Sequence, residues 1–591
     1  MGNTKLDILA CPICYERVTW NVKRAQCKTC RKLYSANNIS HMDLTITGAS
    51  ENLSTEPLPA SIQLFRLPLI SYLYERGWRQ CFYFGGFPGP EKEFEMIKDY
   101  VKPVLGGNII DASCGSGIFS RLFAQSGLFS HVVALDFSET MLKQCFEFIK
   151  RENNFPEESL TLVKADISRL PFVSGSVDAV HAGAALHCWP SPLTAVAEIS
   201  RVLKPGGLFV ATTFVFDVVP QICSLIRPLR QSSIPEVIVK LMAISTVSGA
   251  LLPRQLSSNP VRRRFSVLKS SQLMPFNGRL FAHKVCASSA AAVETKPFLL
   301  FGACFDHNVL RFQNFSETGI GASGYRNTPK EYIARSSLQC SVCRKSYSRK
   351  DSYFDLTITG GGKLYGELKA ASTELFRFPL VSFLYERGWR QSFSLGGGFP
   401  GPEKEFEMIK DYLKPVLGGN IVDASCGSGM FSRLFAKSGL FLNVVALDFS
   451  EAMLKQCYDF VKEENNFPEE NLIMVRADIS RLPFATSSVD AVHAGAALHC
   501  WPSPSAAVAE ISRVLKPGGI FVATTYIVDG PLSYIPLRAP MRQIVAQLSG
   551  SRVFLSEAEL EDLCTSTGLV NFTCIRNRLF VMVSAMKPVQ S

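Results

Sequence analysis

The 591-residue sequence lacks any apolar run that approaches the roughly 20 residues needed to cross a bilayer. It begins Met-Gly-Asn-Thr-Lys-Leu, without the basic and apolar regions of a secretory signal and without the Ser or Thr of a myristoylation motif. These absences argue against a membrane-spanning or secreted protein. We expect a soluble chain that is at most peripheral to a lipid surface.

Acidic residues are almost missing from one stretch in the middle of the chain. Between Met242 and Lys296 there are eight Lys or Arg and one acid, Glu294, so most of the net charge of +11 sits there. The stretch starts Met-Ala-Ile-Ser-Thr-Val-Ser and is rich in serine, which is typical of an organelle transit peptide. An internal transit peptide indicates two joined genes or a tandem duplication, and a plain unstructured basic linker fits equally.

The most informative feature is a heptapeptide, Asp-Ala-Ser-Cys-Gly-Ser-Gly, that occurs at Asp111 to Gly117 and again at Asp423 to Gly429. Each occurrence follows an apolar run and precedes a helix-like segment, which predicts a strand, a glycine turn and a helix. Glycines allow close backbone approach to a ligand, and the helix amino terminus favours electron-rich groups. Taken alone, such a turn also fits a dinucleotide site or simple packing.

Further features follow each turn in the same order. The next apolar run ends in an acid, Asp136 or Asp448, where a carboxylate can accept hydrogen bonds from both ribose hydroxyls. A third run leads to Asp166 or Asp478, which suits the amino group of adenine. A fourth reads Ser-Val-Asp-Ala-Val-His-Ala-Gly-Ala-Ala-Leu-His-Cys-Trp, and Arg-Val-Leu-Lys-Pro-Gly-Gly comes before the fifth. Any one acid fits a strand-end cap, but the ordered set indicates a nucleoside site.

This ordered set resembles the class I S-adenosylmethionine-dependent methyltransferases, of the small-molecule group that includes quinone methyltransferases. The resemblance covers roughly residues 61–215 and 372–587. The resemblance to plant chloroplast-targeted members is especially strong, because they share Tyr-Glu-Arg-Gly-Trp-Arg-Gln and Phe-Pro-Gly-Pro-Glu-Lys-Glu before the core. One departure is that the family's first loop glycine is Ser113 and Ser425 here; we expect binding to survive where this serine keeps a negative φ.

The resemblance implies an α/β fold class with two Rossmann-like domains, S-adenosyl-L-methionine as the cofactor and a small-molecule methyl acceptor. It implies a chloroplast location, whereas a chain used as written, with its transit-like segment inside, would stay in the cytoplasm. The turn would hold the methionine end of the cofactor through its backbone, with Cys426 a loop member and not a nucleophile. The implied cofactor-binding residues are Asp111, Cys114, Gly115, Gly117, Asp136 and Asp166 in the first copy, and Asp423, Cys426, Gly427, Gly429, Asp448 and Asp478 in the second.

Two histidines that follow the fourth runs, His187 and His499, are the candidate catalytic residues. Strand ends face the substrate in such sheets, and an imidazole with a pKa near neutrality can accept a proton from a phenol or enol. A hydrogen-bonded histidine at a strand–helix junction is an equally good interpretation. His493 falls within the strand pattern and is expected to be structural.

The aromatic residues and glycines upstream of each core fit a lid over a hydrophobic acceptor, and equally a helix pair packed on the sheet. By analogy with the family, the acceptor is expected to be aromatic or quinone-like, and contact with plastid lipid would be peripheral.

Four of the 18 cysteines form Cys11-x2-Cys14 and Cys27-x2-Cys30, a spacing that delivers four thiolates to one tetrahedral ion. With no secretory signal, a structural zinc ribbon is favoured over disulfides. The second copy keeps only Cys340 and Cys343, so zinc is expected in the first copy only; completion by Cys304 and His307 is the weaker alternative.

The two copies also differ at their carboxyl ends. The second continues through a helical stretch, Ser556 to Ser566, into apolar runs at Val570 to Asn577 and Leu579 to Ser584, which fit a closing antiparallel hairpin. The first copy lacks these runs, so we expect it to expose a strand edge along Leu208 to Thr212 and to be less stable. The second copy is the expected active one.

These observations divide the chain into a zinc ribbon (1–48), a truncated methyltransferase-like domain (61–241), a transit-peptide-like disordered linker (242–330), a half ribbon (331–360) and a complete methyltransferase-like domain (372–591). Two other functions remain open. One is an RNA methyltransferase that uses the ribbon, which resembles the one before certain rRNA guanine methyltransferase cores and carries basic residues, although a nucleic-acid partner is not expected. The other is a non-catalytic scaffold with two degenerate cores.

Overall fold

The structure is a computed structural model that describes residues 7–20, 24–35, 41–46, 82, 87–213, 311–312, 338–339, 346–347, 349–350, 352–358, 398–527 and 554–589. The Tyr-Glu-Arg-Gly-Trp-Arg-Gln segments, most of the expected linker, Cys304, His307, Cys340 and Cys343 lie outside these residues. Among the described helices, none is long and apolar enough to cross a membrane.

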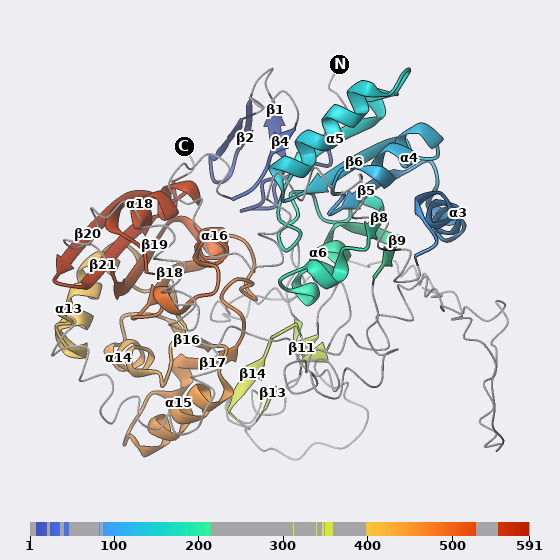
Figure 1. The fold of residues 1–591 in the computed structure, drawn as a ribbon. Helices are drawn as coiled ribbons and strands as arrows, with labels where there is room; N and C mark the ends of the chain where they lie inside the picture. The colour runs from blue at the N-terminus through green and yellow to red at the C-terminus, as the bar shows by residue number, and fades with distance from the viewer. Residues whose placement is uncertain are drawn as a thin grey trace, which may run out of the picture. The chain divides into compact units, whose positions relative to one another are not determined.

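The first copy folds around a parallel sheet with the strand order β4-β7-β6-β5-β8-β9 (Figure 1). Its strands are β4 (Met42–Asp43), β5 (Asn108–Ala112), β6 (His131–Asp136), β7 (Leu160–Lys164), β8 (Val177–Gly183) and β9 (Leu203–Thr212). Both faces of the sheet are covered, so the side chains on both sides of each strand are buried. This is why the strands appear in the sequence as continuous apolar runs. The order reverses between β5 and β8, which places the switch point beside the glycine turn that follows β5.

Helices cover both faces of this sheet. Helices α3 (Pro90–Val101), α4 (Ile118–Ser126) and α5 (Glu139–Arg151) pack on one face, where Phe119 and Phe123 meet Ile109. Helix α6 (Pro192–Val202) packs on the other face together with the ribbon. Serine caps fix the starts of α5 and α6, since Ser138 and Ser191 accept hydrogen bonds from backbone N–H groups of the first turn.

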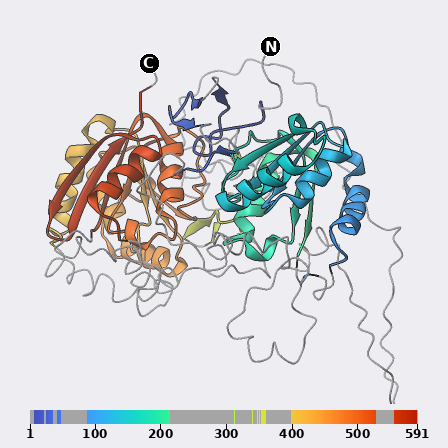
Figure 2. The ribbon, with the colours of Figure 1, turned by 45° about the horizontal axis from the view of Figure 1, so that its top comes forward.

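The second copy repeats this arrangement and completes it. Its sheet has the order β13-β14-β17-β16-β15-β18-β19-β21-β20. The strands are β13 (Arg349–Lys350), β14 (Tyr353–Asp355), β15 (Asn420–Ala424), β16 (Asn443–Asp448), β17 (Leu472–Arg476), β18 (Val489–Ala494), β19 (Leu515–Tyr526), β20 (Val570–Asn577) and β21 (Phe580–Met586). Helices α13 (Pro402–Leu413), α14 (Met430–Ser438) and α15 (Glu451–Glu463) pack on one face, and α16 (Pro504–Val514) and α18 (Glu557–Ser566) pack on the other (Figure 2).

The closing hairpin confirms the predicted difference between the copies. Strand β21 pairs antiparallel with β19 from Ile520 to Tyr526, and β20 pairs with β21. In the described part of the first copy, β9 pairs with β8 alone and forms the edge of the sheet. Among the described residues, the backbone of Leu208 to Thr212 is thus paired on its β8 side only, as expected.

The ribbon is a three-stranded antiparallel sheet of β1 (Val18–Trp20), β2 (Arg24–Cys27) and β3 (Leu33–Ser35). Strand β4 lies within the segment expected to be ribbon, yet it pairs with β7 of the methyltransferase-like sheet, as β14 pairs with β17. A second small sheet joins β11 (Leu338–Gln339) to β12 (Ser346–Tyr347) and to β10 (Arg311–Phe312). Strand β10 thus lies inside the stretch expected to be an unstructured linker.

Candidate cofactor site

The glycine turn is shaped by residues in the left-handed backbone region. Gly427 and Gly429 have φ angles of 58° and 78°, and Gly115 and Gly117 have 57° and 83°. A Cβ at Gly429 would also overlap the sulfur of Cys457 on α15, as one at Gly117 would overlap Cys145. Backbone conformation and close packing therefore both require glycine at the last position of the turn.

The serine that replaces the family glycine does not keep a negative φ. Ser113 and Ser425 both have a φ of 58°, so the condition set for this position is not met. A left-handed conformation costs an L residue about 1–2 kcal/mol. Each serine Oγ accepts a hydrogen bond from a buried indole, Trp189 Nε1 or Trp501 Nε1, at 3.0 Å. This bond ties the turn after the first strand of the core to the segment after the fourth, across the switch point.

The first acid of each turn is held inside the protein. Asp423 is 1% exposed; its Oδ2 accepts from Ser432 Oγ at 2.5 Å, and its Oδ1 lies 2.7 Å from His493 Nδ1. Asp111 has the same contacts with Ser120 and His181. Both carboxylate oxygens therefore anchor the turn to α14 and β18. His493 is buried in the sheet against Phe431 and Phe435, and its structural role stays a prediction.

The second acid closes the turn from the neighbouring strand. Asp448 Oδ2 accepts from Gly427 N at 2.9 Å, and Oδ1 accepts from Ser450 N at 2.8 Å. Burial raises the pKa of Asp448 to about 6, although these N–H groups stabilise the carboxylate. Asp136 has the equivalent bonds and a pKa of about 6 for the same reasons.

The third acid lies just beyond the next strand. Oδ1 of Asp478 accepts from the N–H and the hydroxyl of Ser480, at 3.0 and 2.6 Å, which fixes a tight turn after β17. Oδ1 of Asp166 is bound by Ser168 in the same way. Because β15, β16 and β17 are adjacent and parallel, the carboxyl ends of these strands carry all three acids to one edge of the sheet.

The candidate catalytic histidines differ between the copies. His499 is 5% exposed, with Nδ1 3.1 Å from Thr525 Oγ1 and its ring stacked on Phe554 at 5.7 Å. The ring edge of Tyr526 encloses it from another side. His187 is exposed, and its Nδ1 lies 3.3 Å from Thr213 Oγ1.

Cys426 is expected to be a loop member rather than a nucleophile, and Cys114 is its equivalent in the first copy. Burial and nearby carboxylates raise the pKa of both thiols well above the usual range, which disfavours a thiolate. The sequence did not single out Ser120 and Ser432 as turn anchors, or Trp189 and Trp501 as donors. A signal was present, because both copies keep these residues at the same distance from the turn.

The four ribbon cysteines converge as their spacing predicts. Cys11, Cys14, Cys27 and Cys30 are buried, and their sulfurs lie within 4.8 Å of one another. Tetrahedral zinc thiolates, with Zn–S near 2.3 Å, require sulfur separations of about 3.8 Å. The Cys11 and Cys30 sulfurs are 3.5 Å apart, so this donor set fits a zinc ion.

Residues 110–211 and 422–523 match the family model described as a methyltransferase domain. An uncharacterized chloroplastic methyltransferase of Arabidopsis thaliana is 66% identical over 252 residues, which is 42% of this chain and 71% of the relative. A second protein of that name from Arabidopsis thaliana is 52% identical over 43% of the chain and 72% of its own length. A demethylmenaquinone methyltransferase of Clavibacter sepedonicus is 33% identical over 28% of this chain and 64% of its own length.

Among solved structures, geranyl diphosphate C-methyltransferase of Streptomyces coelicolor, in complex with S-adenosyl-L-homocysteine, is 17% identical with a TM-score of 0.27 over 31% of this chain and 79% of that one. This structural similarity is low, so only the sequence matches identify the family. The chain belongs to the methyltransferase family, and each of its two α/β copies is a class I S-adenosylmethionine-dependent methyltransferase domain.

Proposed function

We propose that the second copy, residues 372–591, transfers the methyl group of S-adenosyl-L-methionine to a small hydrophobic acceptor of aromatic or quinone-like type. The observation that carries this proposal is the environment of His499, which Phe554 and Tyr526 enclose beside a sheet with a complete hairpin. His187, its equivalent, is exposed. Relatives named demethylmenaquinone methyltransferase and sterol 24-C-methyltransferase support a hydrophobic acceptor.

The cofactor supplies a methyl group already activated by its sulfonium, so positioning and exclusion of water are the protein's main tasks. We assign the ribose hydroxyls to Asp448, whose oxygens accept backbone N–H groups, those of Gly427 and Ser450 among them, and retain further lone pairs. We assign the adenine amino group to Asp478. The backbone from Ser425 to Gly429 takes the methionine end, and Asp423 acts by fixing that backbone.

Methylation of a phenol or enol oxygen forms an O–CH3 bond, breaks the S–CH3 bond and leaves one proton to remove. We assign this proton to Nε2 of His499, because Nδ1 faces Thr525. Phe554 and Tyr526 would keep water away from the ring.

The equivalence of the two copies allows a matched test on the whole chain. Asp448→Asn should abolish most of the turnover with a quinol acceptor, which carries the phenol oxygen to be methylated, because the ribose hydroxyls lose a carboxylate. Asp136→Asn makes the same change in the first copy and should cost far less. Equal losses from both variants would overturn the assignment of activity to the second copy, and binding of S-adenosylhomocysteine to neither site would overturn the proposal itself.

We also propose that Cys11, Cys14, Cys27 and Cys30 hold one structural zinc ion. Elemental analysis should give one zinc per chain, and Cys11→Ser with Cys14→Ser should abolish it and unfold the ribbon. Zinc retained by this double variant would contradict the assignment. The names of the Arabidopsis relatives support a chloroplast location for this chain.

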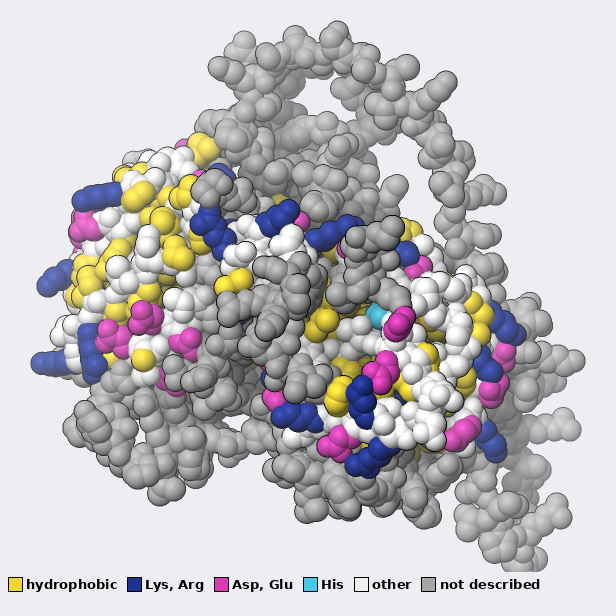
Figure 3. Space-filling view, turned by 90° about the horizontal axis from the view of Figure 1, so that it is seen from above, with side chains coloured by type: hydrophobic (Ala, Val, Ile, Leu, Met, Phe, Trp, Pro, Cys, Tyr) yellow, Lys and Arg dark blue, Asp and Glu magenta, His cyan; other side chains and the backbone are white. Residues whose placement is uncertain are grey.

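The ribbon presents only part of the basic surface that the RNA methyltransferase alternative requires. Lys32 is buried and donates to the carbonyl groups of Ile46 and Ser566, so it does not face solvent. Arg31 donates to Val589 O at 3.3 Å but is exposed, as are Arg17 and Lys28. On the face seen in Figure 3, Lys and Arg side chains lie among Asp and Glu rather than in one basic patch. Phosphate recognition favours such a patch.

A further inference from the structure

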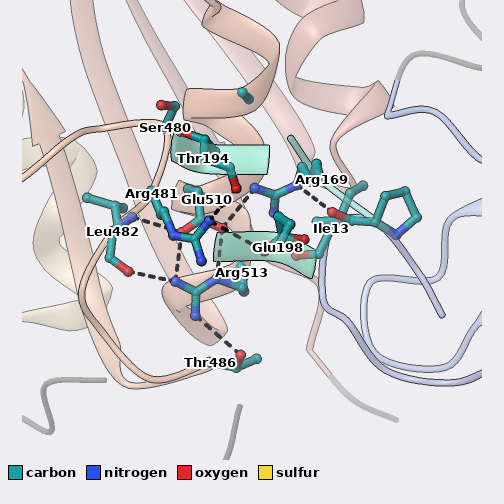
Figure 4. Close-up of polar contacts among 12 residues, drawn as sticks. Ile13, Arg169, Thr194, Glu198, Ser480, Arg481, Leu482, Thr486, Glu510 and Arg513 are labelled. Atoms are coloured by element: carbon teal, nitrogen blue, oxygen red, sulfur yellow. Dashed lines mark hydrogen bonds and ion pairs between the residues drawn. The ribbon is translucent and has the colours of Figure 1, made fainter. Parts of the chain in front are cut away.

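A buried glutamate of the second copy, Glu510 on α16, joins three partners. Its Oε2 accepts from Leu482 N at 2.8 Å and from Arg513 Nη2 at 2.7 Å. Its Oε1 accepts from Arg513 Nε and from Arg169 Nη1, both at 2.9 Å. Leu482 belongs to the turn that begins at Asp478, and Arg169 belongs to the first copy. A residue of the first copy therefore bears on a turn of the second copy's cofactor site (Figure 4).

The reciprocal contact exists in the first copy. Glu198 on α6 accepts from Leu170 N at 3.0 Å and from Arg201, and Arg481 of the second copy lies 3.6 Å from its other oxygen. Arg481 also donates to Thr194 O at 3.4 Å. Arg169 and Arg481 occupy equivalent places in the two copies, as do Glu198 and Glu510. The contact is thus nearly symmetric, with each arginine on the glutamate of the other copy.

Each arginine is part of the turn that carries the adenine-side acid. Arg169 N donates to Asp166 O at 3.0 Å, and Arg481 N donates to Asp478 O at 2.9 Å. The turn of Asp478 is held at Leu482 by Glu510, and Glu510 is held by Arg169. Loss of Arg169 would leave one oxygen of a fully buried carboxylate with fewer donors, and the backbone bond to Leu482 would readjust.

The environment shows that this contact is dry and closely packed. Arg169 is 4% exposed and also donates to the carbonyl groups of Pro12 and Ile13 in the ribbon. The Tyr15 ring lies under both Arg169 and Arg201, at 5.1 and 4.0 Å. Ser512 on the outer side of α16 is fully buried, whereas its equivalent on α6, Ser200, is exposed. Water is therefore a poor substitute for a lost partner here.

We propose that each copy supplies a positioning residue to the cofactor site of the other: Arg169 holds the Asp478 turn through Glu510, and Arg481 holds the Asp166 turn through Glu198. This inference rests on the proposed function, in which these turns receive the adenine. The Arg169 contact is the shorter and more buried of the two, so the second copy depends more on its neighbour.

The test uses the whole chain with Asp136→Ala, which removes the ribose acid of the first copy and leaves one site to titrate. Calorimetry measures the Kd of S-adenosylhomocysteine and of S-inosylhomocysteine, whose base carries an oxygen in place of the amino group. Adding Arg169→Met should weaken adenosyl binding about tenfold, a usual coupling for residues in one network. It should also reduce the preference for adenosyl over inosyl, because Asp478 is displaced from the amino group.

The controls separate the possible failures. Lys204→Met removes a cation of the first copy that pairs with Asp178 and should change neither Kd nor preference. Arg169→Lys keeps the charge and should restore part of the affinity and part of the preference for adenosyl over inosyl. If Arg169→Met fails to fold, the preference of Arg169→Lys tests the positioning role. No binding by the Asp136→Ala chain would refute the proposed function. If the Arg169 variants bind with an unchanged preference, including the case in which both ligands lose affinity equally, the positioning role alone is overturned.

Discussion

Replacing Gly429 by alanine tests whether the turn has the conformation described. Alanine at a φ of 78° pays about 1–2 kcal/mol for a left-handed backbone. Its Cβ would overlap the Cys457 sulfur, and overpacking of this kind costs about 1–3 kcal/mol. The sum, about 2–5 kcal/mol, is a large part of the stability of one domain. Gly429→Ala should therefore destabilise the second copy and abolish its cofactor binding.

Hydrogen exchange read by mass spectrometry can assign this loss to one copy. Helix α14 begins with Met430, whereas the equivalent position of α4 is Ile118, so peptides from the two helices differ in mass. Exchange should rise in α14 and β16 and stay unchanged in α4 and β6. Adding Cys457→Ala removes the overlap and should recover the packing part of the cost but not the backbone part. A Gly429→Ala chain within about 0.5 kcal/mol of the parent, or no coupling to Cys457, would show that the turn does not have this conformation.

Substitutions at Ser425, Asp448 and His499 test the rest of the site. Ser425→Ala should lower the free energy of unfolding in urea by about 1–3 kcal/mol, because buried Trp501 Nε1 loses its acceptor while the left-handed backbone strain stays. Ser425→Gly relieves that strain and should lower it less. The reverse order would contradict the Ser–Trp bond. Burial raises the pKa of Asp448 to about 6, above its unfolded value near 4, so its contribution favours folding most below pH 4 and is lost as pH rises to 6. Cofactor affinity should rise with pH over the same window, and Asp448→Asn should remove that dependence. His499→Gln should lower turnover more than stability if the ring accepts the proton; a loss of stability alone would leave it a packing residue.

The strands, helices and the three acids were predictable because they depend on local pattern. Val132 to Leu135 is a continuous apolar run, and an acid at its end points to the edge of a parallel sheet. The closing hairpin was predictable for the same reason. The side-chain partners were not, because Ser432 and His493 meet Asp423 only after α14 has packed on the sheet. Ser425, which has a positive φ, likewise accepts a hydrogen bond from a tryptophan far along the chain.

Contacts between the copies leave no local signal at all. Arg169 and Glu510 look like ordinary surface residues of a turn and a helix, and only the burial of α16 shows otherwise. Likewise, β4 joins the methyltransferase sheet through only two residues, which are too few to show the hydrophobic pattern of a strand.

A crystal structure of the whole chain with S-adenosylhomocysteine tests the assignment of the site most directly. We predict the ribose hydroxyls on Asp448, the adenine amino group at Asp478 and the amino-acid end over the backbone of residues 425–429. A nucleoside bound elsewhere, or no density at that edge of the sheet, would contradict it.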